Sequence, residues 1–106
     1  MALRRRKPYD RTRILAEAAQ ARKRGRHRKA LGLYRQVLEV EPTNANLHRK
    51  VAPLLARGKE TEQAWESYRQ AAQVLQRQGF SEQAIGLYRE ASRTLPTQVE
   101  VWQALA

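Results

Sequence analysis

Apolar residues recur every three or four positions along almost the whole chain. Near the N-terminus, for example, Ile14, Ala18 and Ala21 fall on one side of a helix. Four later segments repeat this spacing, and none alternates apolar and polar residues as a β-strand does. The pattern predicts an all-α protein with five helices and a short sixth. The predicted breaks lie near Gly25, Pro42, Gly58, Gly79 and Pro96.

Capping and breaking residues set the predicted helix ends. Asp10 can accept hydrogen bonds from free backbone N–H groups at the start of the first helix, and Gly25 can end that helix in the left-handed conformation. Pro53 lies inside the third predicted helix, where a proline costs about 3 kcal/mol. We therefore predict a bend or a break at Pro53. The short links between helices favour antiparallel neighbours and hence stacked hairpins.

One heptapeptide occurs twice. ALGLYRQ at residues 30–36 returns as AIGLYRE at residues 84–90, and each copy has a glycine five residues before it and Pro-Thr twelve residues after its alanine. Both copies place a glycine, Gly32 or Gly86, inside a predicted helix, at a cost of up to about 1 kcal/mol relative to alanine. We expect another part of the chain to approach both glycines closely, in preference to a ligand.

The repeated frame resembles a known family. Residues 25–44 resemble the second half of a tetratricopeptide repeat, a unit of 34 residues and two helices, and the resemblance extends over residues 11–106. It implies a right-handed solenoid of antiparallel helical hairpins. The interval of 54 residues between the two heptapeptides equals 34 plus 20, where 20 is the offset between the two helices of a unit. The fourth helix therefore fits two frames, with Tyr68 on an aromatic position in both, and the third helix is the candidate for the odd one.

The resemblance also implies a function. Tetratricopeptide repeats usually act as non-catalytic scaffolds that bind a peptide or protein segment in a groove lined by their first helices. The residues of this chain at such positions include Arg22, Asn46, Arg49, Arg69 and Gln73. The three arginines favour an acidic or extended partner. No catalytic, metal-binding or cofactor-binding constellation is present in the sequence, because the two histidines lie on different helices and Asp10 is the only aspartate.

Positive charge is concentrated at the N-terminal end of the chain. The net charge is +11; residues 1–29 contribute twelve basic and two acidic residues, and residues 30–106 contribute nine basic and eight acidic residues. An anionic partner, either nucleic acid or an acidic protein surface, is the alternative function that this excess predicts for residues 4–29. The predicted contact residues are Arg4, Arg5, Arg6, Lys7, Arg22, Lys23, Arg24, Arg26, Arg28 and Lys29. The basic stretch holds few aromatic residues to stack on bases, which disfavours single-strand binding.

The ends of the chain differ in character. We predict that residues 1–9 form an unstructured basic arm and that residues 10–106 form the helical-repeat domain, in a soluble cytoplasmic protein. Without cysteine or an apolar run of about 18 residues, the sequence offers neither a disulfide nor a membrane span. Trp102 and Leu105 begin a repeat whose second helix is absent. They are predicted to pair with a second copy of the chain or to continue into further repeats.

Overall fold

The computed structural model describes residues 8–95, which form five α-helices and no strand. The helices are α1 (Arg11–Lys23), α2 (His27–Val40), α3 (Ala45–Arg57), α4 (Thr61–Arg77) and α5 (Ser81–Thr94). The predicted all-α fold and four of its breaks are thereby confirmed. The basic arm up to residue 7 and the sixth helix predicted from Thr97 lie outside the described residues. Within residues 8–95, no helix combines the length and the apolar character needed to cross a bilayer.

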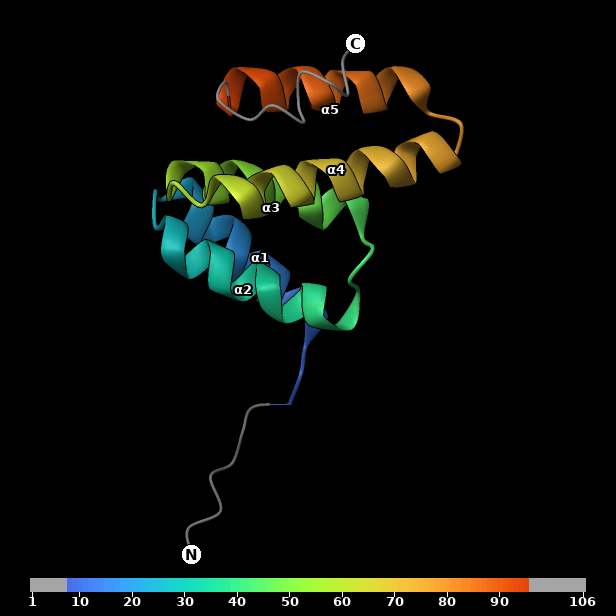
Figure 1. Ribbon diagram of the computed structural model, residues 1–106. Helices are drawn as coiled ribbons and strands as arrows, with labels where there is room; N and C mark the ends of the chain where they lie inside the picture. The colour runs from blue at the N-terminus through green and yellow to red at the C-terminus, as the bar shows by residue number, and fades with distance from the viewer. Residues whose placement is uncertain (1–7, 96–106) are drawn as a thin grey trace, which may run out of the picture.

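The helices stack as hairpins (Figure 1). The α3–α4 pair lies between the α1–α2 pair and α5. The most extensive contacts join α3 to α4, α1 to α2, and α4 to α5, whereas the contact between α2 and α3 is smaller. Helix α4 therefore packs against a helix on each side, as expected for a helix that fits two repeat frames. The right-handed sense of the stack stays a prediction.

Three of the helices end in the same hydrogen-bonded motif. At the end of α1, the N–H of Arg26 donates to the carbonyl of Ala21 over 2.8 Å, and Gly25 adopts a left-handed φ of 76°. This is a Schellman motif, and α4 ends in the same way at Gly79. At the end of α3, however, the left-handed residue is Lys59 with φ 62°, one position after Gly58. This helix thus ends at the predicted place, but a non-glycine residue carries the strained conformation.

Pro53 does not interrupt its helix. Helix α3 runs from Ala45 to Arg57 with Pro53 inside it, so the structure contains no break at this position. A proline lacks the N–H that would bond to the carbonyl four residues earlier, here that of Arg49. Arg49 is exposed and lines an open hollow. Water can therefore satisfy the carbonyl of Arg49, which explains why the helix continues.

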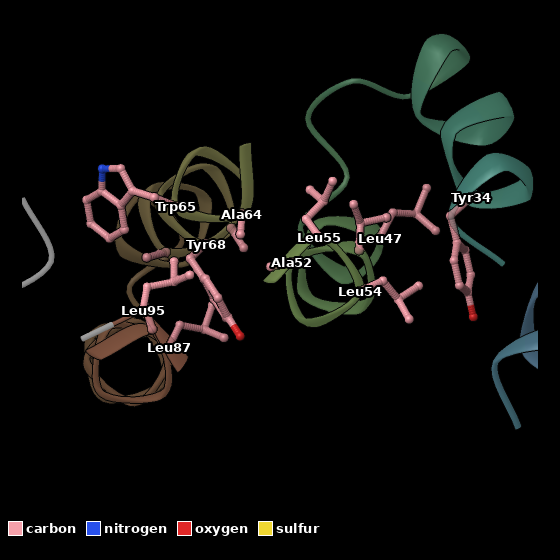
Figure 2. Close-up of a cluster of buried hydrophobic side chains, with 14 of the residues drawn as sticks. Tyr34, Leu47, Ala52, Leu54, Leu55, Ala64, Trp65, Tyr68, Leu87 and Leu95 are labelled. Atoms are coloured by element: carbon pink, nitrogen blue, oxygen red, sulfur yellow. The ribbon is translucent and has the colours of Figure 1, made fainter. Parts of the chain in front are cut away.

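The core is a continuous band of alanine and larger apolar side chains between the helices. Figure 2 shows Tyr68 of α4 pointing toward Leu87 and Leu95, while Leu47, Leu54 and Leu55 project from α3. Tyr34, Tyr68 and Leu95 are among the largest side chains that are fully buried. Many of the remaining core positions are alanines, whose small volume lets the helices approach closely. A chain with few large apolar residues thus still forms a buried core.

The expected close approach to Gly32 and Gly86 is wrong. A Cβ atom added at either glycine would meet no atom within 4 Å, apart from the flanking residues and the backbone of its own helix turn. Both glycines lie on exposed faces of α2 and α5. Each glycine lies two residues before a buried tyrosine, Tyr34 or Tyr88. Residues two apart lie on nearly opposite sides of a helix, so the helical pattern itself places both glycines on the outward face. Packing within the described residues therefore does not explain either glycine.

This correction gives a simple stability prediction. Gly32→Ala and Gly86→Ala should each raise the free energy of unfolding by roughly 0.5–1 kcal/mol, since alanine is the better helix former and restricts the unfolded chain. Urea unfolding followed by circular dichroism measures the change. Gly25→Ala is the matched control and should destabilise the protein, because its φ of 76° disfavours a side chain. A loss of stability at Gly32 or Gly86 would show that something does occupy the space beside that helix.

Candidate functional site

A hollow of about 380 Å³ lies between α3 and α5. Asn46, Arg49, Lys50 and Pro53 line it from α3. Leu87 and Glu90 line it from α5. Asn46 and Arg49 are predicted groove residues, and they lie one turn apart on one face of α3. We call this site the α3–α5 hollow.

A buried tyrosine, Tyr68, positions the carboxylate that lines the α5 side of the α3–α5 hollow. The hydroxyl of Tyr68 donates to a carboxylate oxygen of Glu90 over 2.8 Å. Burial of the phenol raises the pKa of Tyr68 above its usual value, and the hydrogen bond to Glu90 and the charge of Glu90 raise it further. The carboxylate of Glu90 is thus fixed at the edge of the hollow opposite the cations of α3.

Polar and charged groups give the α3–α5 hollow its binding capacity. Arg49 and Lys50 are exposed, and neither has a carboxylate within 4 Å among residues 8–95. Asn46 supplies an amide that can donate and accept, whereas Pro53 and Leu87 supply apolar surface. The arrangement can bind a carboxylate at α3 and an extended backbone beside it. Sequence reasoning missed Leu87 and Glu90, because it assigned groove positions only to first helices.

The other predicted groove residues lie elsewhere. Arg69 pairs with Glu66 on its own helix, and its positive charge acts on nearby Tyr88. Gln73 lines a separate shallow hollow on α4 with Gln76 and Arg77. Arg22 lies in the last turn of α1. The structure therefore brings Asn46 and Arg49 together at one hollow, but not Arg22, Arg69 or Gln73.

The turn between α1 and α2 is strongly basic. Its six positive side chains are all exposed, and we call them the basic turn: Arg22, Lys23, Arg24, Arg26, Arg28 and Lys29. Three of them, Arg24, Arg26 and Lys29, line a hollow of about 360 Å³ together with Gln20 and Glu17. Helix α2 begins beside it without a side-chain cap or an acidic residue in its first turn. The positive end of the α2 dipole therefore adds to the charge of these side chains.

Several candidate residues cannot be placed. Residues 4–7 of the predicted anionic-partner patch lie outside the described residues. The same holds for Trp102 and Leu105, which stay predicted contacts for self-association or for a following repeat. The two histidines within the described part of the chain lie on α2 and α3.

A buried polar network at His48 escaped sequence reasoning. The Nε2 atom of His48 lies 2.7 Å from the carbonyl oxygen of Pro42, and its Nδ1 atom lies 3.3 Å from the hydroxyl of Ser67. A carbonyl only accepts, so Nε2 donates to Pro42, while the hydroxyl of Ser67 can pair with Nδ1 as either donor or acceptor. His48 joins the α2–α3 link to α4. Its two partners explain how a polar ring is accommodated there.

Comparison with protein families agrees with the arrangement of α4 and α5. Residues 65–106 match the model of the tetratricopeptide repeat. The matched residues include most of α4 and all of α5, so this part of the chain is similar to a tetratricopeptide repeat. A comparison with curated proteins finds no match.

The tetratricopeptide match defines one of the two frames of α4. It begins at Trp65, one turn inside α4, and continues beyond α5, so it treats α4 and α5 as the two helices of one repeat. The ring of Trp65 packs against that of Tyr88 on α5, with centroids 5.8 Å apart. Helix α3 nevertheless packs more extensively on α4 than α5 does. Tetratricopeptide repeats generally mediate contacts between proteins.

Proposed function

We propose that this tetratricopeptide-like protein is a non-catalytic scaffold that binds a peptide or protein segment in the α3–α5 hollow. The observation that carries the proposal is the hollow itself, because Asn46 and Arg49 of α3 line it together with Leu87 and Glu90 of α5. Two helices from different parts of the stack thus form one binding surface, as in a repeat groove.

The charges of the hollow favour an acidic segment. Arg49 and Lys50 lie on one wall, and Glu90 on the opposite wall is engaged by Tyr68. An arginine pairs with a carboxylate through two parallel hydrogen bonds, so Arg49 is the residue best suited to recognise a glutamate or aspartate of the partner. Asn46 can bond to the partner's backbone, and Leu87 with Pro53 can take a small apolar side chain.

Charge reversal at Arg49 tests this proposal. A peptide is selected from a random library on the whole protein, labelled, and titrated against variants by fluorescence anisotropy. Arg49→Glu should weaken binding by at least about tenfold, which corresponds to about 1.4 kcal/mol. The matched control is Arg57→Glu, since Arg57 is an exposed arginine on the same helix outside the hollow. Arg57→Glu should leave the affinity within about twofold, a difference of only a few tenths of a kcal/mol.

Two outcomes would count against the α3–α5 hollow. In the first, both charge reversals weaken binding equally, which would indicate attraction by overall charge. In the second, the amide resonances that move on peptide addition lie around Gln73, Gln76 and Arg77 on α4 and not around Asn46 and Leu87. That result would transfer the binding surface to the other candidate face.

A further inference from the structure

The basic turn is the largest unneutralised charge in residues 8–95. Elsewhere in this part of the chain, four arginines have carboxylate partners: Arg11 with Glu41, Arg13 with Glu17, Arg35 with Glu60, and Arg69 with Glu66. None of the six positive side chains of the basic turn has a carboxylate within 4 Å among the described residues. Six like charges within eight residues repel one another, and this cost is offset when an anion binds.

The backbone keeps these charges together. Gly25 and the bond from Arg26 to Ala21 fix the turn, so the side chains on either side of it project from a defined frame. Arg24, Arg26 and Lys29 converge on one hollow. Glu17, a carboxylate that also lines this hollow, lies 4.0 Å from Arg13. The lining of the hollow therefore holds three positive side chains against one carboxylate.

We propose that the basic turn binds the phosphate backbone of double-stranded nucleic acid. A large apolar anchor would favour a folded protein partner, but the exposed large apolar residues of the described chain are Tyr9, Val40, Phe80 and Ile85, and none of them lines this hollow. Single-strand binding needs aromatic platforms for the bases, and no aromatic residue lines the hollow either. Arginine and lysine on a rigid turn suit a regular array of phosphates.

The binding is independent of base sequence and of the α3–α5 hollow. Contacts to phosphate oxygens position a protein on a duplex but read no bases. Each phosphate contact releases condensed counterions, so the affinity should fall as salt increases. The slope of log affinity against log salt concentration therefore reports the number of contacts.

Two triple variants with equal loss of charge test the site. The first removes Arg24, Arg26 and Lys29 by substitution with Gln, and the control makes the same change at Arg57, Arg77 and Arg89, which are exposed and distant in sequence from the turn. Both are titrated against a mixed-sequence DNA duplex at salt concentrations between about 50 and 200 mM. If each of the three residues contacts one phosphate, the slope should fall by about 2.7 for the first variant, at roughly 0.9 per contact. The control slope should match that of the original protein.

Other results would overturn the proposal. Equal slopes for both triple variants would mean that overall charge, and not the basic turn, attracts DNA. Tighter binding to a single strand than to the duplex would require stacking that this hollow does not offer. Binding to polyglutamate without binding to the duplex would identify an acidic protein as the partner. Circular dichroism of each variant establishes that the helices remain intact.

Discussion

Tyr68→Ala and Tyr34→Ala should each lower the free energy of unfolding by about 3–5 kcal/mol, the cost of removing a large aromatic side chain from a packed core. Tyr68 on α4 is completely buried, and Tyr34 on α2 is only 1% exposed. Urea unfolding measures both losses. Tyr9→Ala is the control, because Tyr9 is 49% exposed and should change stability by less than about 0.5 kcal/mol.

The two tyrosines should respond in opposite directions to phenylalanine. The hydroxyl of Tyr68 donates to Glu90, so Tyr68→Phe should cost about 1 kcal/mol. The hydroxyl of Tyr34 is buried and finds no partner within the described residues, so Tyr34→Phe should raise stability by up to about 1 kcal/mol. Losses below about 1 kcal/mol for both alanine variants would show that neither tyrosine belongs to the core and that the repeat frame is misplaced.

The local features of the fold could be predicted from the sequence. The helices follow from apolar spacing, and the ends of α1 and α4 follow from Gly25 and Gly79, because a left-handed residue after a helix favours glycine. Lys59 shows the limit of this reasoning. Gly58 marks the correct end of α3, yet the geometry of the last turn places the next residue in the left-handed position. Which residue takes the left-handed conformation depends on which backbone N–H groups bond to the last carbonyls of the helix; here the N–H of Glu60 bonds to the carbonyl of Leu55.

Features that depend on distant parts of the chain could not be predicted. The bond between His48 and Ser67 joins residues 19 positions apart, and no local pattern marks it. Asn46 and Arg49, two of the predicted groove residues, line the α3–α5 hollow. The repeat frame does not predict Glu90 there, because the frame that begins at Trp65 makes α5 a second helix, and groove positions were assigned only to first helices. The structure shows that α5 nevertheless faces α3.

Stability should fall steeply above about pH 10, and Tyr68 should account for part of the fall. In the unfolded chain Tyr68 has an ordinary pKa of about 10. In the folded protein the pKa of Tyr68 is raised, mainly because burial disfavours the charged phenolate. The carboxylate of Glu90 raises it further, because it accepts a hydrogen bond from the hydroxyl and its negative charge repels the phenolate. Above pH 10 the unfolded chain therefore binds fewer protons than the folded protein. The sign of the linkage follows: the stabilisation from this group is complete below the unfolded pKa and is lost as the pH rises toward the folded pKa.

Tyr68→Phe isolates this contribution. The expected slope from one such group is at most about 1.4 kcal/mol per pH unit, so the free energy of unfolding of the original protein should decrease more steeply than that of Tyr68→Phe above about pH 10. Tyr88, whose pKa is also raised by burial, is present in both proteins, so its contribution cancels in the difference. At neutral pH the original protein should be more stable than Tyr68→Phe by roughly 1 kcal/mol, and this difference should shrink and then reverse as the pH rises. Urea titrations from neutral to strongly alkaline pH measure the difference in the free energy of unfolding between the two proteins. Parallel curves would mean that the hydroxyl of Tyr68 is accessible to water and that the wall of the α3–α5 hollow is open.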